Sequence, residues 1–155
     1  MNWPISSSGM EVVDPTLHPH HHGGNMMRLG YTIIYVQDVT STVAFYERAF
    51  GLQRRFVHES GLYAEMATGD TTLGFAAESM AERNGVAIRP NGRNELPAGF
   101  EICLVTEAPE QGYDQAVAAG ALPVKGVDTK PWGQRVGYVR DINGCLVEIC
   151  SPMAG

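Results

Sequence analysis

The second half of this 155-residue chain repeats the plan of its first half. The first copy opens with an alternating apolar segment at 31–38, continues through a helical pattern over 40–50 and stops at Gly51. The second copy opens at 101–108, continues through 109–119 and stops at Gly120. Segments typical of strands follow each stop, and each copy closes on a short apolar run, at 71–76 and 145–150. The repeat predicts two strand–helix–strand–strand–strand units.

Local signals define where the elements begin and end. Residues 31–36 are apolar at both alternating positions, which is typical of a strand covered on both faces. Asp38 supplies a side-chain acceptor for the first turn of a helix, and Gly51 suits the left-handed conformation that ends one. Asn143 and Gly144 stand between two apolar runs, and because both tolerate a positive φ they predict a hairpin. The remaining strands are expected at 53–59, 61–67, 71–76, 101–106, 122–127 and 134–140.

Composition divides the chain into an extension and one domain. Residues 1–28 are rich in Pro, Ser, Gly and His without periodicity, and we predict a flexible leader, natural or added. Its histidine cluster at 18–22 would hold a divalent metal only loosely, as an affinity tag does. The domain covers 29–155, with a first unit at 29–77, a linker at 78–98 and a second unit at 99–152. The linker is expected either as a flexible connector or as a lid over a site.

Charge and cysteine usage exclude several classes of function. The chain is 44% hydrophobic and 18% charged, as globular proteins are, and its net charge of -6 argues against a nucleic-acid partner. No apolar run approaches the roughly 20 residues that span a membrane. The three cysteines lie in apolar strand runs without a CxxC pair, which predicts buried, reduced thiols and a cytoplasmic location.

The predicted units imply a small-molecule site. If one helix covers one face of each curved sheet, the opposite faces stay free and together form a cup, a shape that suits a small ligand. No GxSxG motif or glycine-rich phosphate loop is present, and the one histidine in 29–155, His58, is expected at the surface of an edge strand. The sequence therefore favours binding or acid–base chemistry over nucleophilic catalysis.

These motifs resemble the vicinal oxygen chelate superfamily, which includes glyoxalase I, bleomycin-resistance proteins, fosfomycin-resistance enzymes and extradiol dioxygenases. The resemblance covers about residues 29–152. It is carried by 36–40 (VQDVT), 45–46 (FY), 50–52 (FGL), 118–121 (AAGA), 130–135 (KPWGQR), 139–144 (VRDING) and 147–149 (VEI). It implies an α+β fold of paired βαβββ units that form a curved-sheet cup, completed in a homodimer.

The resemblance also locates candidate metal positions. Metal enzymes of the superfamily take four ligands, typically His and Glu, from the first and last strand of each unit. Those four places correspond to Tyr31, Gly74, Glu101 and Glu148. Because one of them lacks a side chain and none is histidine, no cofactor is expected, and glyoxalase I and dioxygenase activities are disfavoured. A divalent metal such as Mg²⁺ on the two glutamates is the remaining possibility.

Two glutamates dominate the candidate site. Glu148 lies between Val147 and Ile149, so it faces the cup if those two face the helix, and Glu101 shares a face with Cys103. The resemblance places the two carboxylates on adjacent strands, where they would disfavour simultaneous ionisation and raise one pKa, or the pair would hold a metal cation or an organic ammonium. The structural alternative for Glu148 is an ion pair with Arg135 or a solvent-exposed position at the rim of the cup. The predicted ligand-binding set is Tyr31, Tyr35, Phe75, Glu101, Trp132 and Glu148, with Tyr63 as a further stacking candidate.

Two functions follow from this reading. The first is a metal-independent binding protein that sequesters a planar or cationic compound between aromatic walls and the two glutamates. The second is a lyase or isomerase in which Glu148, as general base, removes a proton next to a carbonyl, with or without a divalent metal. Trp132, in a Pro-Trp-Gly turn, is expected either over the mouth of the pocket or as a local plug.

Overall fold

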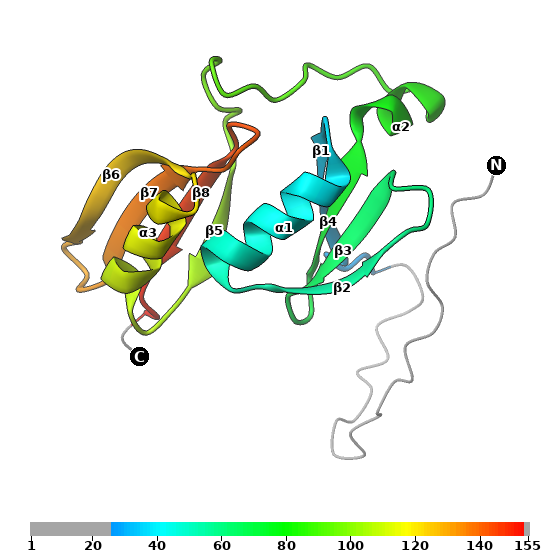
Figure 1. Cartoon of the computed structure of the whole chain (residues 1–155). Helices are drawn as coiled ribbons and strands as arrows, with labels where there is room; N and C mark the ends of the chain where they lie inside the picture. The colour runs from blue at the N-terminus through cyan, green and yellow to red at the C-terminus, as the bar shows by residue number, and fades with distance from the viewer. Residues whose placement is uncertain (1–25, 154–155) are drawn as a thin grey trace.

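A computed structural model describes residues 26–153 and contains two units of the same topology (Figure 1). The first unit consists of β1 (Tyr31–Val36), α1 (Val39–Phe50), β2 (Gln53–Val57), β3 (Tyr63–Ala67) and β4 (Thr72–Ala77). The second consists of β5 (Glu101–Val105), α3 (Pro109–Ala118), β6 (Leu122–Thr129), β7 (Arg135–Arg140) and β8 (Leu146–Cys150). Within this part of the chain no helix is long and apolar enough to cross a membrane. The predicted duplication and the α+β class are confirmed.

Each unit forms its own four-stranded sheet. The strand orders are β1-β4-β3-β2 and β5-β8-β7-β6, and in both sheets the first and last strands of the unit pair in parallel while the others are antiparallel. The register places Ile33 opposite Gly74 in the first sheet and Cys103 opposite Glu148 in the second. These two pairs are therefore equivalent positions of the repeat.

One helix covers one face of each sheet, and the core lies between them (Figure 1). Asp38 caps α1 by accepting a hydrogen bond from the backbone N–H of Ser41 at 2.8 Å, and Gly51 ends the helix at φ 67°. Val43, Phe45 and Tyr46 of α1 are fully buried against the sheet. Both boundaries of this helix were predicted, because capping groups stand directly beside the apolar pattern.

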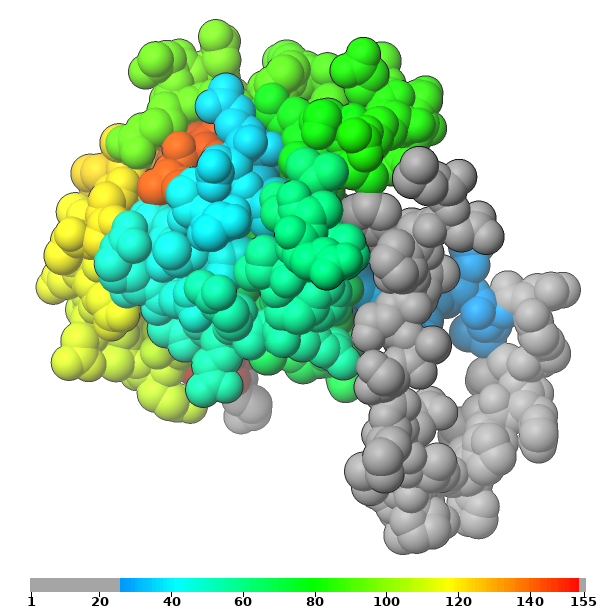
Figure 2. All heavy atoms as spheres, turned by 45° about the vertical axis from the view of Figure 1, so that its right-hand side comes forward, coloured from blue at the N-terminus to red at the C-terminus, as the bar shows by residue number. Residues whose placement is uncertain are grey.

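The two units meet through α1 and α3 and through the hairpin that joins β7 to β8. The Tyr46 hydroxyl of α1 donates a hydrogen bond to Asp141 Oδ2 at 2.6 Å, and Asn143 Nδ2 donates to Thr42 Oγ1 at 3.1 Å. Figure 2 shows this hairpin, in orange, lodged between the start of the first unit's helix and the linker. The predicted hairpin is confirmed, although only Gly144 of the Asn-Gly pair has a positive φ.

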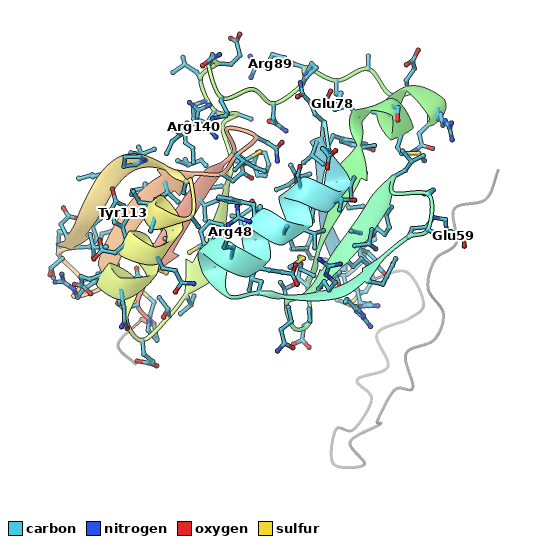
Figure 3. The ribbon with its side chains drawn as sticks, viewed as in Figure 1. Arg48, Glu59, Glu78, Arg89, Tyr113 and Arg140 are labelled. Atoms are coloured by element: carbon cyan, nitrogen blue, oxygen red, sulfur yellow. The ribbon has the colours of Figure 1, made fainter. Side chains whose placement is uncertain are left out.

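The linker contains a short helix that the sequence did not predict, α2 (Glu78–Arg83), followed by an extended segment. Arg140, labelled in Figure 3 beside this segment, donates a hydrogen bond from its guanidinium to the carbonyl oxygen of Gly92 at 3.0 Å. Asn91 donates from Nδ2 to the carbonyl oxygen of Tyr35 at 3.2 Å. The linker is thus fastened to both units, and any opening of it as a lid would break these bonds.

Candidate functional site

The first unit presents a face lined with tyrosines. Along β1, Tyr31, Ile33 and Tyr35 alternate with the buried Ile34 and Val36, so they lie on the side of the sheet away from α1. Tyr31 is 45% exposed and Ile33 is 42% exposed. The pairing of β1, β4 and β3 adds Gly74, Tyr63 and Glu65 to the same side. We call these six residues the tyrosine face.

A carboxylate lies buried in the tyrosine face. Glu65 is only 4% exposed, and its Oε2 accepts a hydrogen bond from the Tyr63 hydroxyl at 2.9 Å. Its Oε1 lies 3.9 Å from a guanidinium nitrogen of Arg55. Burial raises the pKa of Tyr63, and the Glu65 carboxylate and Tyr31 raise it further. Sequence reasoning missed Glu65, although the period of two along β3 places it on the same side as Tyr63.

The resemblance assigns a metal-ligand position to Gly74, but in the structure the space beside this glycine is filled. A Cβ atom on Gly74 would lie 3.1 Å from the Tyr63 hydroxyl oxygen and 3.4 Å from Ile33 Cγ1. The resemblance assigns two metal-ligand positions to the first unit, Tyr31 and Gly74. Of these two, only Tyr31 has a side chain with a donor atom, its phenol oxygen. The superfamily's usual set of His and Glu ligands does not fit this chain.

The second unit presents a different face, which we call the glutamate–cysteine face: Glu101, Cys103, Tyr138, Glu148 and Cys150. Glu148 lies between Cys103 on β5 and Tyr138 on β7 in the register. The Tyr138 hydroxyl donates to Glu148 Oε1 at 3.0 Å, and the Cys103 thiol donates to Oε2 at 2.9 Å. The Cys103 and Cys150 sulfur atoms are 3.4 Å apart.

The two glutamates of this face are electrostatically linked, as the sequence predicted. Burial raises the pKa of Glu101, and hydrogen bonding with Glu148 and its charge raise it further. Burial opposes ionisation of Glu148 too, but hydrogen bonds from Cys103, Tyr138 and Glu101 outweigh it and lower its pKa. Of the two carboxyl groups, Glu148 is therefore the stronger acid and Glu101 the one that ionises less readily. Arg135 does not pair with Glu148; its guanidinium contacts Glu110 instead, so the alternative of a Glu148–Arg135 ion pair is wrong.

Other predicted positions need correction. Phe75 is fully buried, with its ring centroid 4.8 Å from that of Tyr46, because alternation along β4 turns it toward α1. It does not line the predicted cup. Trp132 is 58% exposed, with Nε1 donating to Gln134 Oε1 at 2.9 Å, so it is not a packed plug. All three cysteines are free, but Cys103 is exposed where burial was predicted.

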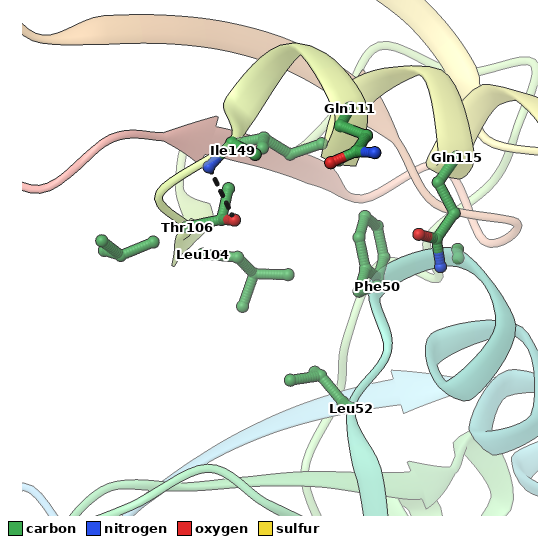
Figure 4. Close-up of a pocket in the computed structure, with 11 residues that line it drawn as sticks. Phe50, Leu52, Leu104, Thr106, Gln111, Gln115 and Ile149 are labelled. Atoms are coloured by element: carbon green, nitrogen blue, oxygen red, sulfur yellow. Dashed lines mark hydrogen bonds between the residues drawn. The ribbon is translucent and has the colours of Figure 1, made fainter.

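A separate pocket of about 260 Å³ lies between the units, where α1 ends and α3 begins (Figure 4). Phe50 and Leu52 form one wall, and Leu104 and Ile149 form another. The described residues that line it include no titratable side chain. The pocket suits an apolar ligand, whereas the carboxylates and thiols of the candidate site lie on the tyrosine face and the glutamate–cysteine face.

The chain belongs to the Glyoxalase/Bleomycin resistance protein/Dioxygenase superfamily, whose sequence model matches residues 28–149. Paired βαβββ units of this kind are the vicinal oxygen chelate fold, so the resemblance seen in the sequence is confirmed. The chain is 28% identical over 125 residues to YraH of Bacillus subtilis (strain 168), described as an uncharacterized protein; the match covers 79% of this chain and 97% of YraH.

Solved structures agree with this fold. A glyoxalase-related enzyme from Fulvimarina pelagi superposes with a TM-score of 0.69 at 21% identity, covering 82% of this chain and 89% of that one. A family enzyme from Burkholderia phytofirmans PsJN gives 0.67 at 23% identity, covering 81% and 98%. TioX from Micromonospora sp. ML1 gives 0.62 at 20% identity, also covering 81% and 98%. At these identities the likeness establishes the fold and not the activity.

Proposed function

We propose that the protein binds a small planar compound that carries a positive charge, with the tyrosine face as the main contact surface. The observation that carries this proposal is the burial of Glu65, a carboxylate on a sheet face whose neighbours are aromatic. Charged side chains are rarely buried without a functional or structural partner. A cationic ligand is one partner that this site would accept.

The surroundings of Glu65 match such a ligand in two respects. Tyr31 and Tyr35 offer flat rings for stacking, and a cation over an aromatic ring gains about 0.5–2 kcal/mol. Arg55 is 51% exposed and its nearest nitrogen is 3.9 Å from the carboxylate, beyond hydrogen-bonding distance. The Arg55 side chain is therefore free to turn into water when a ligand cation approaches Glu65.

The second unit supplies an acidic counterpart. Within one chain the tyrosine face and the glutamate–cysteine face belong to separate sheets. Tyr31 and Ile33 of the first sheet and Val105 of the second are exposed. In the homodimer that the resemblance implies, the tyrosine face of one protomer meets the glutamate–cysteine face of its partner. Light scattering after size-exclusion chromatography tests whether the homodimer forms. A monomer at micromolar concentration would contradict the meeting of the two faces.

Binding fits the geometry better than proton abstraction by Glu148. Both oxygens of that carboxylate already accept hydrogen bonds, from Tyr138 and from Cys103. These hydrogen bonds stabilise the ionised carboxylate and lower its pKa, which makes Glu148 a weaker general base. The hydrogen-bonded carboxylate instead serves as a fixed negative charge.

A titration of the full chain with two planar probes tests the proposal. Ethidium supplies a planar cation and anilinonaphthalene sulfonate a planar anion, and both report binding by fluorescence. We expect ethidium to bind more tightly, and Glu65→Gln to weaken it about tenfold or more, which corresponds to about 1.4 kcal/mol. Glu59→Gln, at an exposed carboxylate beside the same unit, is the matched control. Equal affinity for ethidium in wild type and Glu65→Gln would refute the proposal.

A further inference from the structure

We propose that Cys103, Cys150 and Glu148 form a binding site for a soft divalent cation of the Zn²⁺ or Cd²⁺ class. The superfamily's usual positions do not supply this site, because only Glu148 belongs to both sets. Cys103 and Cys150 are donors that the resemblance does not assign. The inference depends on the second unit alone. Glu148 also belongs to the face proposed as the acidic counterpart of the ligand, but Glu65, which carries that proposal, takes no part in the metal site.

The donor atoms are already gathered. One thiol sulfur from each cysteine and a carboxylate oxygen of Glu148 all lie within 4.8 Å of one another. The nearest separations are 2.9 Å between Cys103 Sγ and Glu148 Oε2 and 3.4 Å between the two sulfur atoms. Around tetrahedral zinc, with Zn–S of about 2.3 Å and Zn–O of about 2.0 Å, such donors stand about 3.5–3.8 Å apart. Small outward rotations of the side chains therefore admit the ion.

The framework that holds these donors is rigid. Cys103 comes from β5 and the other two from β8, and the two strands pair in parallel over five residues. The Tyr138 hydroxyl donates to Glu148 Oε1 and leaves Oε2 directed at the cysteines. Such an orienting hydrogen bond is a regular feature around metal-binding carboxylates. Glu101, hydrogen-bonded to Glu148, stands beside the site and would supply a fourth donor, the second oxygen.

The types of donor select the class of ion. Two thiols and a carboxylate suit Zn²⁺ or Cd²⁺, whereas Mg²⁺ and Ca²⁺ require oxygen donors throughout. The thiolate is the form of cysteine that binds a metal, so uptake of the cation by Cys103 and Cys150 is accompanied by release of protons. Cys103 is exposed, so an ion reaches the site from solvent.

Cd²⁺ titration of the reduced full chain tests the site, followed by the ultraviolet thiolate-to-cadmium charge-transfer band. This band reports sulfur ligation only, so the histidines at 18–22 do not contribute to it. We expect saturation at one Cd²⁺ per chain and at least a hundredfold loss of affinity in Cys103→Ala and Cys150→Ala. The buried Cys145 is the matched control thiol, and Cys145→Ala should titrate as wild type does.

The outcomes separate this inference from the proposed function. Unchanged titration of Cys103→Ala, which alters an exposed side chain and keeps the core intact, would overturn the metal site. A loss of the band in Cys145→Ala alone would overturn it too. Glu148→Gln should weaken Cd²⁺ without abolishing the band, because both sulfur ligands remain. Glu65→Gln should leave the Cd²⁺ titration unchanged, so failure of either proposal is recognisable without reference to the other.

Discussion

The hydrogen bond between Tyr46 and Asp141 joins the two units, and its removal is a sharp test of the fold. Both residues are fully buried, and the hydroxyl–carboxylate distance is 2.6 Å. The other carboxylate oxygen, Oδ1, accepts backbone N–H groups of Asn143 at 2.8 Å and Cys145 at 2.9 Å. Asp141 thus organises its own hairpin with one oxygen and contacts α1 with the other.

Tyr46→Phe removes one hydroxyl and keeps the ring, which packs against Phe75. A buried hydrogen bond to a charged group contributes about 1.5–3 kcal/mol, and water has no access to replace it here. We expect the free energy of unfolding to fall by about 2 kcal/mol. For a domain of this size that corresponds to a decrease in Tm of about 4–8 °C.

The loss should increase with pH. Burial raises the pKa of Asp141, while the Tyr46 hydroxyl and three backbone N–H groups lower it in part. Because its folded pKa lies above the unfolded value, the contribution of Asp141 to stability is largest below about pH 3.9 and is lost as pH rises through the folded pKa. Removing the hydroxyl raises the folded pKa further, so the variant loses more stability than wild type as the carboxylate ionises.

Urea unfolding at pH 4 and pH 8 measures both effects. Tyr113→Phe is the matched control, because the described part of the chain provides no hydrogen bond to that hydroxyl and its loss should cost less than about 0.5 kcal/mol. If Tyr46→Phe costs no more than the control at pH 8, the role assigned to this contact is wrong. A double-mutant cycle with Asp141→Asn then isolates the pairwise energy.

Two further substitutions test the fold. Gly144→Ala should lower the free energy of unfolding by about 3 kcal/mol or more, because a Cβ atom there would overlap with the carbonyl oxygen of Gly92. The control Gly69→Ala has a similar φ but open space around it, and should cost about 1–2 kcal/mol of backbone strain. Equal costs of the two variants in thermal unfolding would contradict the close contact between Gly144 and the linker. Phe75→Ala truncates a buried core side chain and should lower the free energy of unfolding by about 3–5 kcal/mol. Trp132 is exposed, so Trp132→Ala should change it by no more than about 0.5 kcal/mol in the same urea assay. A small effect of Phe75→Ala would contradict the burial of Phe75 and support its predicted place on the ligand face.

The sequence predicted features that depend on neighbouring residues. Strand and helix boundaries in the first unit are set by Asp38 and Gly51, whose effects act within one turn of α1. The approach of Glu101 to Glu148 was also predicted, because the resemblance places the first and last strands of a unit side by side and the structure pairs them in parallel. The roles proposed for these glutamates in binding remain predictions.

What the sequence by itself determined was the duplicated order of elements, since periodicity and capping are properties of short segments. Tertiary structure decided which side of each strand faces the helix, and a shift of one residue exchanges those sides. For that reason Phe75 was assigned to the ligand face and Glu65 was missed. The contact between the sulfur atoms of Cys103 and Cys150 depends on the register between two strands, because the two cysteines lie 47 residues apart in the sequence. No local pattern encodes that distance, because it is the packing of the whole second unit that brings the two sulfur atoms together.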